Sequence, residues 1–181
     1  MKKLVTAHDL TFEPFISSSD IAEKITELGK KITEKYKGKR PLFLGILNGS
    51  FVFIADLVRA CDLECEIAFI RLSSYKGVKS TGKIETIYGF EINLENRHVI
   101  VVEDIVDSGR TLNYFMETLT EKKPASVELA SLLLKPDALQ FPIKIDYLGF
   151  EISDKFVVGY GLDYDGLCRN LKGIYQLKET P

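Results

Sequence analysis

The sequence lacks tryptophan and contains only two histidines and three cysteines among its 181 residues. Cys61, Cys65 and Cys168 form no CxxC pair, and only His8 and His98 could complete a zinc set with them. These absences argue against a metal centre or a redox centre built on cysteine. We therefore expect the cysteines to be ordinary buried apolar residues.

Long apolar runs and a strong excess of one charge are also absent. No uninterrupted apolar stretch follows the basic start, so neither a signal peptide nor a membrane span is expected, and we predict a cytoplasmic protein without a membrane partner. The formal net charge is −2, which excludes a strongly basic surface. A nucleic-acid partner is therefore not expected, and any phosphate chemistry must come from a local site.

The composition is that of an ordinary folded protein. Hydrophobic residues make up 45% of the chain and charged residues 28%, a balance that argues against disorder. A chain of this length can bury a continuous core without disulfides. We therefore predict one domain over residues 1–181.

Several segments have the periodicity of helices and buried strands. Ser19-Asp20 as a polar cap, followed by apolar residues at helical spacing up to Ile32, predicts a helix that stops at Gly38. Further helices are predicted at 51–58 and 111–119. Predicted strands are 42–47, 66–70, 98–102 and 127–134, with short strands near 147–150 and 156–160. The alternation predicts an open, mainly parallel, twisted α/β sheet flanked by helices.

The chemistry of the chain is concentrated after the predicted strand at 98–102. Glu103 and Asp104 follow it directly, where an open α/β sheet binds its ligands. Residues 107–111, DSGRT, then lead into a helix whose free backbone N–H groups would form an anion site. A sugar phosphate with a metal-bound diphosphate suits both features, because its phosphate fits the loop while its diol or metal faces the acids.

A plainer interpretation is that residues 107–109 form only a turn and a helix cap. The two acids at the strand end make that interpretation less favourable. No GxxxxGK[ST] motif occurs, and Gly159-Tyr160-Gly161 lacks the third glycine of a dinucleotide fingerprint. P-loop and Rossmann assignments therefore fail.

Residues 101–112, VVEDIVDSGRTL, resemble the signature with which type I phosphoribosyltransferases bind phosphoribosyl pyrophosphate (PRPP). This resemblance alone leaves enzymes for adenine, orotate, uracil and hypoxanthine-guanine open, together with PRPP-sensing regulators of the same fold. Residues 47–50, 71–75, 134–136 and 149–164 are similar in order and spacing to the hypoxanthine-guanine subfamily. The resemblance implies a type I phosphoribosyltransferase fold with a core at about 18–148 and a small hood formed by the N-terminal segment and about 149–181.

The resemblance implies a role for each residue of the signature. Asp107 is the catalytic residue, placed near N7 of the base to accept or share a proton. The residues that bind PRPP and its 5′-phosphate are Glu103, Asp104, Asp107, Ser108, Gly109, Arg110 and Thr111. Asn48, Gly49 and Arg169 bind pyrophosphate, and because some relatives carry lysine where this chain has Asn48, backbone N–H groups, Arg169 and magnesium must share that task.

The purine site is implied by residues further along the chain. Its members are Lys135, Phe156, Val157 and Asp163, with Phe156 stacking on the ring. Lys135 donates to the 6-oxo group, and a cation there favours a carbonyl over the amino group of adenine. Xanthine stays open as a third 6-oxopurine, because nothing in the sequence ranks it against hypoxanthine and guanine.

The remaining implications concern metal, lid and partners. The cofactor is Mg²⁺, held through Glu103, Asp104 and Asp163, and Ser74 and Tyr75 belong to a flexible lid loop at 73–83 that excludes water. The partners are PRPP, hypoxanthine or guanine, the products IMP or GMP, and pyrophosphate. Members of the family commonly form dimers or tetramers, so a homodimer or homotetramer is expected.

Overall fold

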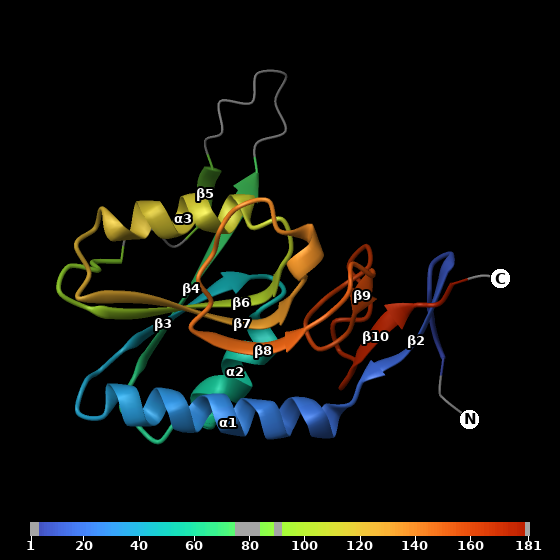
Figure 1. The fold of residues 1–181 in the computed structure, drawn as a ribbon, viewed down its shortest axis with the longest axis horizontal. Coiled ribbons are helices and arrows are strands. Elements are labelled where there is room, and N and C mark those ends of the chain that lie inside the picture. The colour runs from blue at the N-terminus through green and yellow to red at the C-terminus, as the bar shows by residue number, and fades with distance from the viewer. Residues whose placement is uncertain (1–3, 75–83, 89–91, 180–181) are drawn as a thin grey trace.

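The chain folds into two sheets, three α-helices and a short 3₁₀ helix (Pro136–Ala138) in a computed structural model that describes residues 4–74, 84–88 and 92–179 (Figure 1). The larger sheet, called the main sheet, has the strand order β5-β4-β3-β6-β7-β8. Its strands are β3 Leu42–Leu47, β4 Glu66–Ser74, β5 Ile84–Tyr88, β6 His98–Val106, β7 Ser126–Leu134 and β8 Tyr147–Glu151. All neighbouring pairs are parallel except β5, which runs antiparallel to β4 at the edge. The predicted open, mainly parallel sheet is therefore confirmed.

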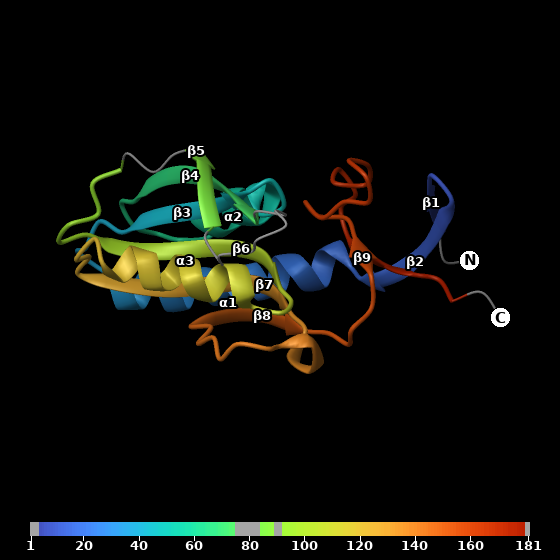
Figure 2. The same ribbon diagram turned by 90° about the horizontal axis from the view of Figure 1, so that it is seen from above.

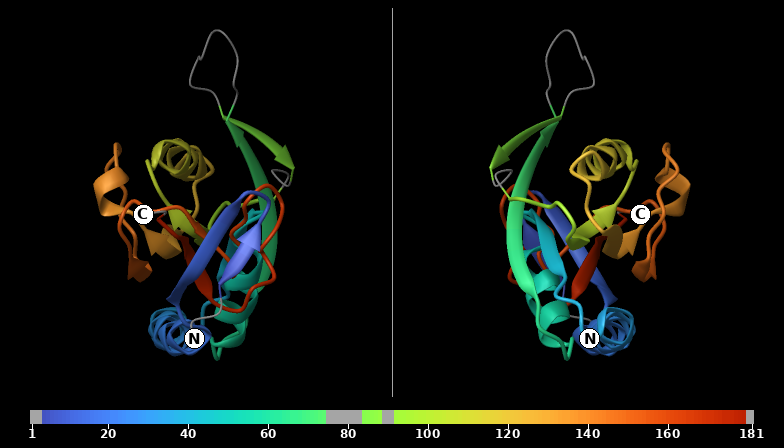
Figure 3. Two further views of the ribbon diagram at one scale, coloured as in Figure 1. Left: turned by 90° about the vertical axis from the view of Figure 1, so that its right-hand side faces the viewer. Right: turned by 90° about the vertical axis from the view of Figure 1, so that its left-hand side faces the viewer.

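Helices cover both faces of the main sheet, as the end-on views show (Figure 3). Helices α1 Ser18–Tyr36 and α2 Phe51–Arg59 pack on one face, and α3 Arg110–Thr120 packs on the other. Successive residues of β6 point alternately to these two layers: Ile100 and Val102 join the core under α1, while Val99 and Val101 join the core under α3. A strand covered on both faces has no polar face, which explains its uninterrupted apolar sequence.

The second sheet, called the small sheet, combines both ends of the described chain. Its order is β1-β2-β10-β9, formed by β1 Val5–Ala7, β2 Leu10–Ile16, β10 Ile174–Leu177 and β9 Val157–Val158. All three pairings are antiparallel. The small sheet lies beyond the carboxyl ends of the parallel strands (Figure 2), so it faces the edge at which the main sheet carries its polar residues.

Helix α1 begins earlier than the sequence pattern suggests. Its N-cap is Ser17, whose hydroxyl accepts from the backbone N–H of Asp20 at 3.1 Å, while the Asp20 carboxylate accepts from the backbone N–H of Ser17 at 3.3 Å. The two bonds form a reciprocal capping box. The predicted cap at Ser19-Asp20 is therefore wrong, because Ser19 lies inside the helix and Asp20 occupies position N3 of the capping box.

Three other predictions need correction. Strand β6 extends to Val106, so Glu103 and Asp104 lie within the strand and do not follow it. The strand expected at 156–160 is only Val157–Val158, and it belongs to the small sheet. The three cysteines are free but only partly buried. No helix in the described ranges is long and apolar enough to span a membrane.

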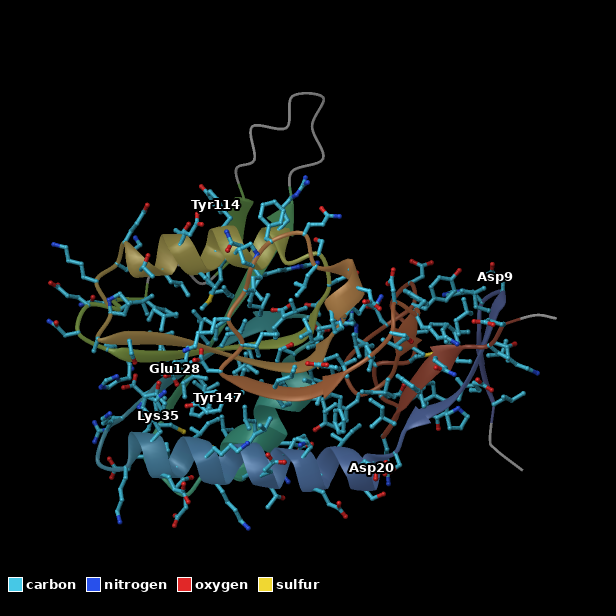
Figure 4. All side chains as sticks on the ribbon, in the orientation of Figure 1. Asp9, Asp20, Lys35, Tyr114, Glu128 and Tyr147 are labelled. Carbon is cyan, nitrogen blue, oxygen red and sulfur yellow. The ribbon has the colours of Figure 1, made fainter. Side chains whose placement is uncertain are left out.

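A partly buried ionic cluster joins α1 to the main sheet on the side away from the small sheet (Figure 4). Glu128 of β7 accepts a hydrogen bond from the Tyr147 hydroxyl at 2.7 Å and forms an ion pair with Lys35 of α1. Burial raises the pKa of Glu128, but the bonds from Lys35 and Tyr147 outweigh it and lower the pKa below its usual value. This carboxylate therefore fastens helix to sheet in its charged form.

Candidate active site

Two adjacent carboxylates lie near the end of β6. Glu103 is partly buried, and its Oε2 atom is buried without a hydrogen-bond partner in the described part of the chain. Burial and the neighbouring Asp104 raise the pKa of Glu103 well above its usual value. Burial also raises the pKa of Asp104, although the N–H of Ile105, 2.9 Å from Asp104 Oδ1, opposes that effect. Such a pair is suited to a cation or to hydroxyl donors that replace the lost water.

The loop after β6 ends on the N-terminus of α3. Gly109 is the N-cap residue and has φ +75°, a left-handed conformation that glycine adopts without steric cost. A Cβ at Gly109 would lie 2.8 Å from the Ile143 side chain, so the loop is also packed tightly from behind. The free N–H groups of the first turn of α3 therefore follow a loop whose residue Gly109 has no side chain.

A pocket of about 330 Å³ lies over this loop. Its lining includes six of the predicted residues: Glu103, Asp107, Ser108, Gly109, Arg110 and Thr111. The structure thus brings the acid of β6 and the whole DSGRT loop to one cavity. The guanidinium of Arg110 lies 5.6 Å from the centre of the Phe141 ring, which places its charge beside the loop.

The turn after β3 packs against Asp104. The peptide bond between Leu47 and Asn48 is cis. A Cβ at Gly49 would lie 1.5 Å from Asp104 Oδ2, so the backbone of this turn lies directly against the carboxylate. On its other side, a Cβ at Gly161 would lie 2.1 Å from the carbonyl oxygen of Gly49. The turn is therefore held between the end of β6 and the segment that follows β9.

Arg169 connects this segment to the same region. Its guanidinium donates to the carbonyl of Gly161 at 2.7 Å and pairs with Asp163 at 2.6 Å. The positive charge of Arg169 contributes to lowering the pKa of Asp104, against the larger effect of burial. Of the predicted pyrophosphate residues, Gly49 and Arg169 thus lie around Asp104, and Asn48 directly precedes Gly49 in the turn.

Asp163 is not grouped with the two acids of β6. Its carboxylate pairs with Arg169 and accepts the backbone N–H of Gly166 at 2.7 Å. No cluster of three or more potential metal ligands occurs among the described residues. The predicted set of Glu103, Asp104 and Asp163 is therefore not assembled by the protein alone.

Lys135 lies immediately after β7, next to Asp107. Its side chain is buried, and its Nζ is 3.9 Å from Asp107 Oδ2 and 3.0 Å from Asp154 Oδ1. The backbone N–H of Lys135 donates to the carbonyl of Val106 at 2.9 Å, which aligns the ends of β7 and β6. This register brings together the predicted catalytic acid and the predicted base-reading cation.

Phe156 and Val157 lie apart from the pocket, at the start of β9 in the small sheet. Phe156 is 42% exposed. Its ring centre lies 6.0 Å from that of Phe12 and 5.7 Å from that of Tyr164. Val157 is buried. Phe156 thus contacts two aromatic neighbours, in tilted and edge-on geometry, while part of the residue stays exposed.

The predicted lid is only partly within the described residues. Ser73 and Ser74 end strand β4, so the expected loop begins after them and not at Ser73. Tyr75 and residues 76–83 lie outside the described residues.

Two residues of the site have no role in the sequence interpretation. Asp154 contacts Lys135, and Gly161 supports the turn at Gly49. Asp154 could have been noticed in the sequence, because it is an acidic residue two positions before Phe156, the predicted stacking ring. Nothing in the sequence indicates that Gly161 meets Gly49, because that contact joins segments more than 100 residues apart.

Comparison with known proteins agrees with this geometry. The phosphoribosyl transferase domain family matches residues 17–165. The chain is 43% identical to the bifunctional protein TilS/HprT of Listeria monocytogenes, over 90% of the chain but a quarter (25%) of that longer protein. It is 44% identical to the hypoxanthine-guanine phosphoribosyltransferase of Lactococcus lactis, with 90% and 89% of the two chains covered.

A solved structure gives the same result for the fold. The crystal structure of a hypoxanthine phosphoribosyltransferase from Staphylococcus aureus superposes with a TM-score of 0.87 at 41% identity, covering 92% of this chain and 91% of that one. The sequence signature, the sheet order and these likenesses agree. The chain belongs to the phosphoribosyl transferase domain family, in its hypoxanthine-guanine phosphoribosyltransferase branch.

Proposed function

We propose that the chain transfers the 5-phosphoribosyl group of PRPP to N9 of hypoxanthine or guanine, giving IMP or GMP and pyrophosphate in 6-oxopurine salvage. The observation that carries this proposal is the placement of Lys135 Nζ 3.9 Å from Asp107 Oδ2, beside the anion loop at the start of α3. A cation and a carboxylate side by side match the oxo group and the N7 edge of one purine ring.

The 5′-phosphate of PRPP is proposed to bind the loop from Asp107 to Thr111. The backbone N–H groups at the start of α3 and the hydroxyls of Ser108 and Thr111 supply donors, and the helix terminus favours negative charge. Gly109 allows the phosphate to approach the backbone closely. Anchoring the phosphate here positions the ribose over the end of β6.

Glu103 and Asp104 are proposed to face the ribose hydroxyls and Mg²⁺. The unpartnered Oε2 of Glu103 and its neighbour Asp104 form a donor set of hard oxygens, which suits Mg²⁺. Mg²⁺ usually takes one or two carboxylates and completes its shell with water and substrate phosphates, so the missing third protein ligand is consistent with this fit. When bound, the ion neutralises the charge of the departing diphosphate.

The base is proposed to stack on Phe156, with its 6-oxo group at Lys135 and its N7 edge at Asp107. Val157 supplies its backbone to the base edge, and Asp163 lies next to this segment. Asp107 then holds or accepts a proton at N7 while N9 attacks C1 of the ribose. The two acids of β6 stabilise the positive charge that develops on the ribose ring.

Pyrophosphate is proposed to leave toward Asn48, Gly49 and Arg169. Arg169 is already paired with Asp163 at 2.6 Å, so its position is set before substrate binds. Ser74 and Tyr75, with the loop up to residue 83, are proposed to close over the reacting centre and exclude water.

We further propose a single domain whose small sheet acts as the hood over the base, working as a homodimer or homotetramer in the cytoplasm. These assignments rest on the resemblance to the family. Light scattering after size-exclusion chromatography measures the mass of the assembly, and a monomer at micromolar concentration would contradict the oligomer.

The test of the proposed reaction is nucleotide formation from PRPP and Mg²⁺, followed by ultraviolet absorbance with hypoxanthine, guanine, xanthine, adenine and uracil in parallel. Turnover of hypoxanthine or guanine that stops when Mg²⁺ is chelated is the expected result. PRPP binding without turnover of any base would contradict the enzyme and favour a PRPP-sensing regulator.

A further inference from the structure

Lys135 is the one buried cation in the described part of the chain, with 8% of its surface exposed. A buried ammonium group is costly unless carboxylates compensate its charge. Two carboxylates from different segments of the chain lie near the Lys135 ammonium group. Asp154 accepts a hydrogen bond at 3.0 Å, while Asp107 lies at 3.9 Å, beyond hydrogen-bonding distance.

Asp154 belongs to a connection that is fixed to the strand carrying Lys135. The segment runs from the end of β8 to the start of β9. Within it, the backbone N–H of Ile152 donates to the carbonyl of Leu134 at 2.8 Å, and the Ile152 side chain is buried. Leu134 also pairs with Glu151 in the β7–β8 ladder, so the chain stays fixed to β7 one residue beyond β8. Asp154 therefore follows, by two residues, a backbone position that is hydrogen-bonded to the strand carrying Lys135.

We propose that Asp154 is a positioning residue that holds the Lys135 ammonium toward the base and away from Asp107, and so sets the affinity for 6-oxopurines. The inference deepens the proposed function and rests on it. An ammonium group has three donors, and the bond to Asp154 uses one of them. Two donors remain for the 6-oxo group of the base.

The alternative position of Lys135 explains why a second carboxylate matters. A lysine side chain has four flexible carbons, and Asp107 is its other ion-pair partner. Without Asp154, the ammonium would close the 3.9 Å gap to Asp107. Lys135 and Asp107 would then form an ion pair with each other. Neither side chain would be oriented to contact the purine as the proposed reaction requires.

The test compares Asp154→Asn with the unaltered chain. The variant keeps the shape of the side chain but loses its charge. We expect the KM for hypoxanthine to rise about tenfold, the size of loss typical when the partner that orients a binding group is removed, while the KM for PRPP stays unchanged. Calorimetry should show IMP binding weakened relative to AMP binding by about the same factor, because only IMP carries the 6-oxo group. Asp154→Glu restores the charge and should recover part of the loss.

Glu179→Gln is the matched control. Glu179 pairs with Lys155, the residue next to Asp154, at 3.1 Å, but this pair does not touch Lys135. We expect unaltered kinetics for this variant. Equal KM values for hypoxanthine in Asp154→Asn and the unaltered chain would overturn the inference, and so would an equal rise in the KM of PRPP. Failure of the unaltered chain to convert any 6-oxopurine would instead overturn the proposed function.

Discussion

Substituting Gly49 by alanine should damage the site far more than the fold. The added Cβ would lie 1.5 Å from Asp104 Oδ2 and 2.4 Å from Cγ. Ordinary contact begins near 3.4 Å, so the turn or the carboxylate must move by well over 1 Å. The turn cannot easily move away from Asp104, because the carbonyl oxygen of Gly49 already packs against Gly161. A Cβ built at Gly161 would lie only 2.1 Å from that oxygen. Asp104 is therefore the group that must shift.

Displacing a substrate-positioning group by about 1 Å costs roughly 10²-fold in rate. We expect kcat/KM for PRPP to fall by at least that factor in Gly49→Ala. The steric strain should lower the free energy of unfolding by about 1–3 kcal/mol, which corresponds to a decrease in Tm of roughly 2–12 °C for a chain of this size.

Gly38→Ala is the control for backbone strain alone. Gly38 has φ +72° and follows α1, and a Cβ added there would have no neighbour within 4 Å. We expect a loss of stability of about 1 kcal/mol with unchanged kcat/KM. Steady-state kinetics with PRPP as the varied substrate and thermal unfolding of both variants give the comparison. Unchanged kcat/KM in Gly49→Ala would refute the close packing of the turn on Asp104.

Three further variants test other parts of the structure. Glu128→Gln should lower the free energy of unfolding by about 1–3 kcal/mol through the lost pair with Lys35. Because the folded pKa of Glu128 is lowered, this contribution is complete above its usual pKa of 4.5 and disappears as pH falls through the folded value; urea unfolding across that range measures it. Ser17→Ala should cost about 1 kcal/mol by opening the capping box with Asp20, visible in the same assay. Gly109→Ala adds strain at φ +75° and a 2.8 Å contact behind the loop at 107–111, where the phosphate of PRPP is proposed to bind, so calorimetric titration should show weaker PRPP binding.

Much of the main sheet can be predicted from local sequence patterns. The apolar segment at 42–47 coincides with β3, and the turn containing Gly49 leads into α2 as expected. Periodicity succeeds there because each buried strand lies between two helical layers and carries no competing polar face. The pattern ends β6 too early, because Glu103 and Asp104 interrupt the apolar run while the strand continues to pair with β7.

The small sheet and the contacts of Lys135 cannot be predicted in the same way. Strand β10 pairs with β2, more than 150 residues earlier in the chain, and no local pattern encodes such a partner. The loop at 107–111 is recognisable because all its groups are contiguous. The pairing of Lys135 with Asp154 depends on the register of β7, β8 and the following connection, which only the fold determines.

Single-turnover conversion of hypoxanthine to IMP by the unaltered chain and by Asp107→Asn tests the proposed chemistry most directly. Asp62→Asn, a change of the same kind on an exposed loop away from the pocket, serves as the control. We predict rapid conversion by the unaltered chain and by the control, and a rate slower by roughly 10²-fold or more for Asp107→Asn, as for the loss of a general base. Equal rates for all three proteins would contradict the role of Asp107, and no conversion by any of them would contradict the proposed reaction.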